Sequence, residues 1–137
     1  MSSNTAKWLR WRFDVYSYSY DHWPEEPGVY VFARLDSKPH TTPRWKVLYV
    51  GQCRDFSDRL SDHERREEAK RQGMTHVHIR VVNSPSRRDR IECRIWAEFE
   101  PPMNKIAPEG CRDYLRMRQR EGRLRRLMRR IRETLSG

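Results

Sequence analysis

Two tyrosines, an arginine and a histidine have side chains that could do chemistry. Tyr30 and Tyr49 lie in two strand-like stretches, and their phenols would line one face of a sheet. Arg59 and His63 are four residues apart, which places both side chains on the same face of a helix. A guanidinium can bind two phosphate oxygens, while a histidine can contact phosphate or move a proton near neutral pH. A tyrosine, with an ordinary pKa of about 10, needs a nearby cation to act as a base.

A hairpin would position the tyrosines, and the helix after it would position the arginine and histidine. Residues 28–35 and 45–50 are rich in β-branched and aromatic side chains, which predicts two strands joined by a long loop. Asp55 or Ser57 could cap a helix over about 56–72.

A third strand and a second helix are expected next. Apolar and polar residues alternate over 74–82, which predicts a strand with one apolar face. The Ser-Pro pair that follows opens a helix to Phe99, where two prolines end it. Glu92 lies on this helix between Ile91 and Ile95, where ordinary patterning could also leave it exposed.

The two ends of the chain have compositions of their own. Residues 8–20 alternate aromatic and polar side chains, which predicts an edge strand or an extended arm that touches nucleic acid. Residues 112–137 contain ten arginines and three acidic residues, and their apolar residues repeat at the spacing of an amphipathic helix. We therefore divide the chain into an N-terminal aromatic arm (1–27), a central domain (28–104) and a basic helical tail (105–137), packed as one unit.

Composition points to a polyanionic partner. The 137 residues carry a formal net charge of +10, and phosphates bound by Lys or Arg release condensed counterions. No stretch is apolar enough to span a membrane and the N-terminus has no secretory pattern, so we expect a cytoplasmic protein. Three cysteines without a C-x-x-C pair predict reduced thiols. His76 and His78 share one face of the third strand, but two ligands alone do not make a closed metal site.

The central domain contains an ordered series of motifs. In chain order they are Gly28-Val29-Tyr30, Tyr49-Val50-Gly51, Arg59 with His63, Glu92, and a Pro-x-x-Asn sequence that ends at Asn104. This series resembles the GIY-YIG nuclease family over residues 28–104. The resemblance implies an α/β (α+β) fold with a small central three-stranded, mainly antiparallel sheet flanked by helices. An extra N-terminal strand and the basic C-terminal helix would be added to it.

The resemblance also implies a metal-dependent endonuclease that hydrolyses phosphodiester bonds. Glu92 would bind the divalent cation, Mg²⁺ or alternatively Mn²⁺, because phosphate oxygens and waters can complete the shell around one carboxylate. Arg59 would contact the scissile phosphate, and one of the two tyrosines would orient or deprotonate the attacking water. His63 is a second candidate for the base or for a phosphate contact. The residues expected to support the site are Gly28, Gly51 and Asn104.

One departure from the family pattern concerns the cation near the tyrosines. The family commonly has a lysine directly after the second motif half, where this chain has Gln52 and then Cys53. Lys46 and Arg54 are the candidates to take its place, and both are also expected to contact nucleic acid.

Double-stranded DNA is the expected partner. The tail would bind its phosphate backbone through Arg116, Arg120, Arg123, Arg126 and Arg130. One such site cuts one strand, so the chain would act as a nickase, or as a double-strand cutter if it forms a homodimer through the apolar stripe of the tail. A phage or mobile-element origin would place it in the cytoplasm of a host cell. Two alternatives stay open, namely an inactive nucleic-acid-binding module on the same scaffold and an interaction protein whose basic helix docks on an acidic partner.

Overall fold

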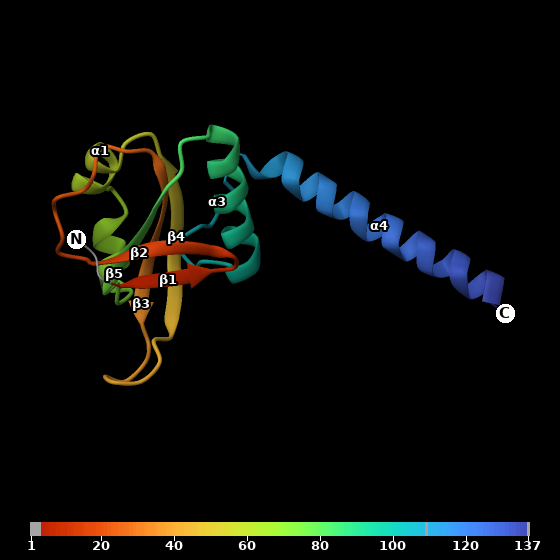
Figure 1. The fold of residues 1–137 in the computed structure, drawn as a ribbon, viewed down its shortest axis with the longest axis horizontal. Helices are drawn as coiled ribbons and strands as arrows, with labels where there is room; N and C mark the ends of the chain where they lie inside the picture. Colours follow the sequence, from red (N-terminus) through yellow and green to blue (C-terminus); the bar gives the residue numbers. More distant parts are fainter. Residues whose placement is uncertain (1–3, 109, 137) are drawn as a thin grey trace.

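A five-stranded antiparallel sheet forms the centre of the molecule in the computed structural model, which describes residues 4–108 and 110–136. The strand order is β1-β2-β5-β3-β4 (Figure 1). β3, β4 and β5 are the three strands that the sequence predicts for the central domain, and the expected α+β class is confirmed. The strands are β1 (Thr5–Trp8), β2 (Trp11–Ser17), β3 (Gly28–Leu35), β4 (Trp45–Cys53) and β5 (His76–Val81).

The N-terminal arm folds into a hairpin that widens the expected three-stranded sheet to five strands. Trp8 pairs with Trp11 across a two-residue turn, in which Leu9 has a φ of 56°. β2 then pairs with β5 along the edge of the central strands. The sequence does not predict this turn, because Leu9 occupies a position at which tight hairpin turns favour Asn, Asp or Gly.

The single helix expected over 56–72 is wrong, because the structure has two short helices there. Asp55 caps the first helix by accepting a hydrogen bond from the Ser57 N–H at 2.8 Å. Asp62 leaves helical geometry, and the break turns the side chain of His63 into the interior. The described helices are α1 (Phe56–Ser61), α2 (Arg66–Arg71), α3 (Pro85–Phe99) and α4 (Cys111–Ser136).

Alternation along β3 separates two apolar layers. Val29 and Val31 pack in a cluster with residues of α3 on one face of the sheet. Tyr30 and Phe32 pack on the other face with residues of α1 and α2. Tyr49 pairs directly with Phe32, so it packs against this second layer as well, and the bulge next to this pair adds Leu48 to the same layer.

α4 leaves the sheet and runs outward from α3 (Figure 1). A disulfide between Cys93 and Cys111 joins the start of α4 to α3, so the expectation of three reduced thiols is wrong. The sequence spacing could not show that the chain after α3 folds back to bring these sulfurs together. Cys53 is free and half-buried. The apolar stripe of α4 is exposed and consists of Leu124, Leu127, Met128, Ile131 and Leu135.

Candidate active site

The hydroxyl of Tyr30 is the centre of a buried polar cluster on the α1–α2 face of the sheet. It lies 2.8 Å from Nε2 of His63 and accepts a hydrogen bond of 3.3 Å from Nε of Arg59. The ring of Tyr49 lies beside it, with centroid distances of 6.2 Å to Tyr30 and 5.5 Å to His63. We call Tyr30, Tyr49, Arg59 and His63 the phenol cluster. The structure therefore brings together four of the five residues to which the sequence assigns chemistry.

Hydrogen bonding and burial fix the protonation of this cluster. The backbone N–H of Arg65 donates to Nδ1 of His63 at 3.0 Å, so the neutral ring carries its hydrogen on Nε2 and donates it to Tyr30. Burial lowers the pKa of His63 to about 4, and the charge of Arg59 adds to the effect. Burial also raises the pKa of Tyr30; Tyr49 adds to that shift and Arg59 opposes it. At neutral pH the imidazole is uncharged and the phenol keeps its proton.

The guanidinium of Arg59 is held by an acidic neighbour. Its two terminal nitrogens form hydrogen bonds of 2.5 and 2.9 Å with the carboxylate of Glu64. The hydrogen bond from Arg59 lowers the pKa of Glu64 to about 2, so the carboxylate is ionised. Because the Glu64 side chain is 61% exposed, an incoming anion can compete with it from solvent. Arg59 can bind a phosphate through both nitrogens only after this ion pair opens.

A second cation lies beside the tyrosines where the sequence does not indicate one. The guanidinium carbon of Arg65 lies 5.5 Å from the centre of the Tyr49 ring. Lys46, one of the two expected substitutes, is exposed near the start of β4, at the opposite end of the strand from Gln52. Arg54, the other, is exposed directly after β4. No motif marks Arg65, because its position depends on the break between α1 and α2.

Two glycines permit close packing at the ends of β3 and β4. A Cβ at Gly51 would lie 2.4 Å from the hydroxyl oxygen of Tyr30. A Cβ at Gly28 would lie 2.0 Å from the carbonyl oxygen of Arg80 and 2.4 Å from the ring of Phe56. Any side chain at Gly51 would therefore displace the phenol from the cluster, and any side chain at Gly28 would separate β3 from its neighbours.

Glu92 lies in a pocket on the α3 side of the sheet. It is only 7% exposed, and Oε1 accepts a hydrogen bond of 3.2 Å from Nε2 of Gln52. The same nitrogen donates to Oδ1 of Asp89 at 2.6 Å. Burial raises the pKa of Glu92 to about 7; the hydrogen bond from Gln52 opposes this shift and the charge of Asp89 adds to it. These three residues and Gly110 line a pocket of about 530 Å³, which we call the carboxylate pocket.

Gln52 and Asp89 are site residues that the sequence reasoning missed. Asp89 precedes Glu92 by three residues on α3, so helical spacing already places both carboxylates on one face. That spacing is the signal that could have found Asp89. The contact with Gln52 joins residues 37 positions apart, and no local pattern reports it.

The phenol cluster and the carboxylate pocket lie on opposite faces of the sheet and approach each other at the edge strand β4. Among the described residues, no hydrogen bond or ion pair joins Glu92 to Tyr30 or Arg59. The connection runs through the backbone: Gly51 contacts the Tyr30 hydroxyl, and the next residue, Gln52, binds Glu92. Gly51 adds no side chain at this point.

Solved structures of a GIY-YIG nuclease domain are similar to this chain. One is the N-terminal endonuclease domain of UvrC from Thermotoga maritima bound to magnesium, with a TM-score of 0.43 and 24% identity over 60% of this chain and 86% of that chain. Two tyrosine-to-phenylalanine variants of that domain, bound to the catalytic divalent cation, have TM-scores of 0.45 and identities of 21% and 20% over the same shares. The chain resembles a GIY-YIG nuclease domain in fold. No protein-family model and no curated protein sequence matches it.

Asn104 fastens the free edge of β4. Its side-chain oxygen accepts a hydrogen bond of 2.8 Å from the Val50 N–H, and its nitrogen donates to the Val50 carbonyl at 2.9 Å. The backbone N–H of Met103 donates to the carbonyl of Leu48 at 3.0 Å. The segment after α3 thus lies along β4 directly before Gly51, which is consistent with the supporting role expected for Asn104.

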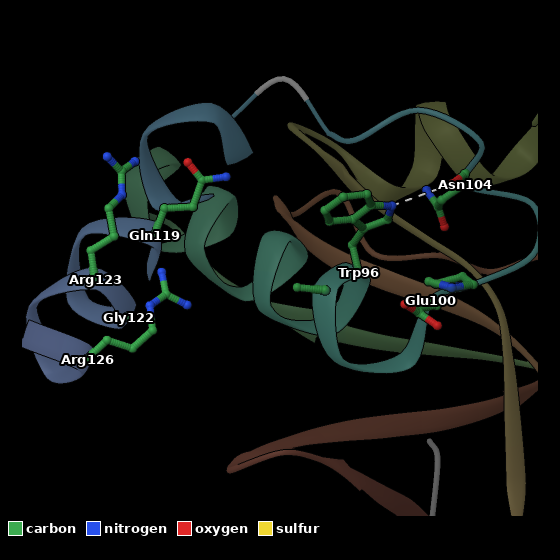
Figure 2. A pocket seen from close by; sticks show the side chains of 9 residues that line it. Trp96, Glu100, Asn104, Gln119, Gly122, Arg123 and Arg126 are labelled. Carbon is green, nitrogen blue, oxygen red and sulfur yellow. Dashed lines mark hydrogen bonds between the residues drawn. The ribbon is translucent and has the colours of Figure 1, made fainter. Parts of the chain in front are cut away.

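The arginines expected to bind DNA are exposed along α4. Arg123 and Arg126 face a groove of about 960 Å³ between α4 and α3, whose other wall includes Trp96 and Asn104 (Figure 2). None of the helices in the described residues is both long and apolar enough to cross a membrane. The exposed arginines of the expected set are Arg116, Arg120, Arg123, Arg126 and Arg130.

The two histidines of β5 serve the packing of the sheet. His78 is fully buried and accepts a hydrogen bond of 2.9 Å from Nε1 of Trp8. His76 lies within hydrogen-bonding distance of the hydroxyl of Thr75, at 2.8 Å. Within residues 4–108 and 110–136, no group of three His, Cys, Asp or Glu side chains is arranged to hold a metal ion. A cation at Glu92 would therefore need waters or phosphate oxygens as ligands.

Proposed function

We propose that this chain is a divalent-metal-dependent endonuclease that hydrolyses phosphodiester bonds in DNA. The observation that supports the proposal is the arrangement at the edge of β4. There the Tyr30 hydroxyl lies against Gly51, with Arg59 and His63 bound to it, and Gln52 binds Glu92 one residue further along. In this proposal one phosphate at this edge meets the phenol, the guanidinium and the carboxylate.

The carboxylate pocket fits a small divalent cation. Glu92 is almost completely buried, yet among the described residues no Lys, Arg or His forms an ion pair with it or with Asp89. Their shared hydrogen-bond donor, Gln52, is neutral. A buried carboxylate stays ionised only when an opposite charge lies nearby, and oxygen ligands with waters suit Mg²⁺ or Mn²⁺. When bound, such a cation neutralises charge on the phosphate and makes a bound water more acidic.

Arg59 binds the scissile phosphate in this proposal. A guanidinium can donate two parallel hydrogen bonds to phosphate oxygens, in the same geometry that it now uses with Glu64. Exchange of one partner for the other is easy, because an exposed ion pair contributes at most about 1 kcal/mol. Arg59 would keep its hydrogen bond from Nε to Tyr30 throughout.

Tyr30 orients the attacking water. Its oxygen accepts hydrogen bonds from Arg59 and His63, so its own hydroxyl hydrogen is available to a water or to a phosphate oxygen. Two donors on one phenol oxygen also stabilise negative charge that develops there when a proton moves. His63 stays uncharged and holds the hydroxyl in place.

DNA is the proposed substrate, and the three parts of the chain have separate roles. Residues 28–104 carry the chemistry, 1–27 complete the sheet, and 105–137 bind the DNA backbone without reading its sequence. A monomer with one site nicks DNA, whereas a homodimer formed through the apolar stripe of α4 would cut both strands. We place the protein in the cytoplasm, which would be that of a host cell for a phage or mobile-element protein.

Plasmid nicking tests the activity. The full chain should convert supercoiled DNA to the open circular form with Mg²⁺ or Mn²⁺ and lose this ability with a chelator. Glu92→Gln should be inactive, while Glu98→Gln, which removes an exposed carboxylate from the same helix, should cut normally. Salt-dependent DNA binding without any metal-dependent nicking would instead favour the inactive binding module.

The role of α4 in DNA binding needs a separate measurement. Replacing both Arg123 and Arg126 by Gln should weaken binding to unrelated duplexes to the same extent, because phosphate contacts carry no sequence information. The slope of log affinity against log salt should fall by about one for each lost contact. An unchanged slope would remove these two arginines from the DNA interface.

A further inference from the structure

Gln52 links the two carboxylates of the carboxylate pocket. Its single side-chain nitrogen has two hydrogens, and it donates to Asp89 at 2.6 Å and to Glu92 at 3.2 Å. Both acceptors come from one face of α3, whereas the donor comes from the end of β4. The amide thus holds two carboxyl groups at a fixed separation, which neither group could achieve by itself.

The described residues that line the pocket include two carboxylates and no cationic side chain. Two carboxylates one helical turn apart repel each other, and a neutral amide does not cancel their charge. A lysine in place of Gln52 would form an ion pair with one of them. Each carboxylate uses one oxygen for Gln52, and no other described residue forms a hydrogen bond with its second oxygen. Mg²⁺ is commonly held by one or two carboxylates while it keeps several waters.

The backbone at Gly110 closes the pocket on the side of Asp89. A Cβ at Gly110 would lie 2.5 Å from Cγ of Asp89, so only glycine allows the carboxylate its present position. The disulfide of the next residue, Cys111, to Cys93 fastens this backbone to α3 beside Glu92. The wall of the pocket is therefore covalently joined to the helix that carries both carboxylates.

We infer that the cation in the carboxylate pocket is bound by two carboxylates, Asp89 and Glu92, and that Gln52 is the positioning residue that sets their spacing. This inference rests on the proposed function, since it takes Glu92 to be a ligand of a divalent cation. It adds Asp89 as a second ligand and gives Gln52 a role that a cationic side chain could not fulfil.

Mn²⁺ titration of the full chain without DNA, followed by the electron paramagnetic resonance signal of free Mn²⁺, tests the inference. Asp89→Asn should weaken Mn²⁺ binding at least about tenfold, and Gln52→Leu should weaken it by about 10- to 100-fold, the range typical of lost outer-shell partners. Asp89→Glu should keep most of the affinity because it keeps the charge. Glu98→Gln is the matched control and should bind Mn²⁺ as the wild type does.

Gly110→Ala provides a second variant that keeps both carboxylates. The added methyl group should displace the Asp89 carboxylate and weaken Mn²⁺ binding, without removing any ligand. For each variant, cleavage measured against Mg²⁺ concentration should show a higher half-saturating concentration, with the maximal rate largely recovered at high Mg²⁺. General damage to the fold would not be reversed in this way.

The outcomes separate the inference from the function beneath it. If Glu92→Gln abolishes Mn²⁺ binding while Asp89→Asn and Gln52→Leu bind it like the wild type, a single carboxylate holds the cation and the inference is overturned, although the nuclease proposal stands. If the wild type neither binds Mn²⁺ nor nicks DNA with Mg²⁺, the proposed function itself fails.

Discussion

The phenol cluster and the carboxylate pocket are both buried polar sites next to β4, but their charged groups have different kinds of partner. In the phenol cluster, Tyr30 has two donors, and Arg59 has a phenol and a carboxylate as acceptors. In the carboxylate pocket, Asp89 and Glu92 share one neutral amide. The first site contains its own cationic side chain, whereas no Lys, Arg or His in the described part of the chain forms an ion pair with the carboxylates of the second.

This difference suggests a division of roles between the two faces of the sheet. A complete hydrogen-bond network holds its groups in place before substrate arrives, which is what positioning a water or a phosphate requires. In the carboxylate pocket Gln52 already holds the two carboxylates, and an entering cation supplies the opposite charge. Changes in the two regions should therefore respond differently to added metal.

The largest effect is expected from the carboxylate pocket. Glu92→Gln removes the buried charge that would hold the cation, and a bound metal contributes several kcal/mol of charge stabilisation, so nicking should fall by about a thousandfold or more. The glutamine should leave the fold intact, since a neutral side chain suits a buried site better than a charge does. Metal titration and nicking should be lost together. Loss of nicking with unchanged Mn²⁺ affinity would assign Glu92 a role other than cation binding.

In the phenol cluster, Tyr30→Phe should reduce the nicking rate by about 10²- to 10⁴-fold while Mn²⁺ binding stays unchanged. The variant also leaves the donors of Arg59 and His63 without their acceptor, which should cost about 1–3 kcal/mol of unfolding free energy. Tyr18→Phe, at an exposed tyrosine, is the matched control for both measurements. If Tyr30→Phe weakened Mn²⁺ binding as much as Glu92→Gln, the two regions would not be separate sites.

The sequence predicts the phenol cluster well because its geometry follows from local periodicity. Tyr30 lies on the expected face of β3, and Tyr49 shares that face because it pairs directly with Phe32. Arg59 and His63 stay on one side even though the helix breaks between them. A four-residue spacing therefore places both side chains on one side even when the helix between them is interrupted.

The remaining features depend on contacts between distant parts of the chain. The bond from Gln52 to Asp89 requires the end of β4 to meet α3, and the disulfide of Cys93 requires the chain after α3 to fold back. The ion pair of Arg59 with Glu64 depends on the break after α1. None of these follows from hydrophobic periodicity, which reports only which face of an element is buried.

The uncharged state of His63 makes the phenol cluster sensitive to acid. Its folded pKa of about 4 lies below the unfolded value of about 6.5, so its contribution to stability is present above pH 6.5 and is lost as pH falls toward 4. Between pH 7 and pH 5, urea unfolding should show that the wild type loses about 2 kcal/mol more than His63→Gln does. The exposed His22→Gln should lose as much as the wild type. Equal losses in all three proteins would mean that His63 is not buried uncharged.

The smallest effect is expected where the phenol cluster meets solvent, at the ion pair of Arg59 with Glu64. Glu64→Gln should free the guanidinium for phosphate, and because an exposed pair contributes about 0.2–1 kcal/mol, DNA affinity or nicking should rise by up to about fivefold. Glu67→Gln makes the same change of net charge at an exposed position of α2 and isolates the general electrostatic effect. The gain of the Glu64 variant over this control should shrink as salt is added, since both competitors for Arg59 are screened. A Glu64→Gln protein that nicks more slowly than its control would show that Glu64 positions Arg59 for catalysis instead of blocking it, and the phenol cluster would then be complete only with its acidic neighbour in place.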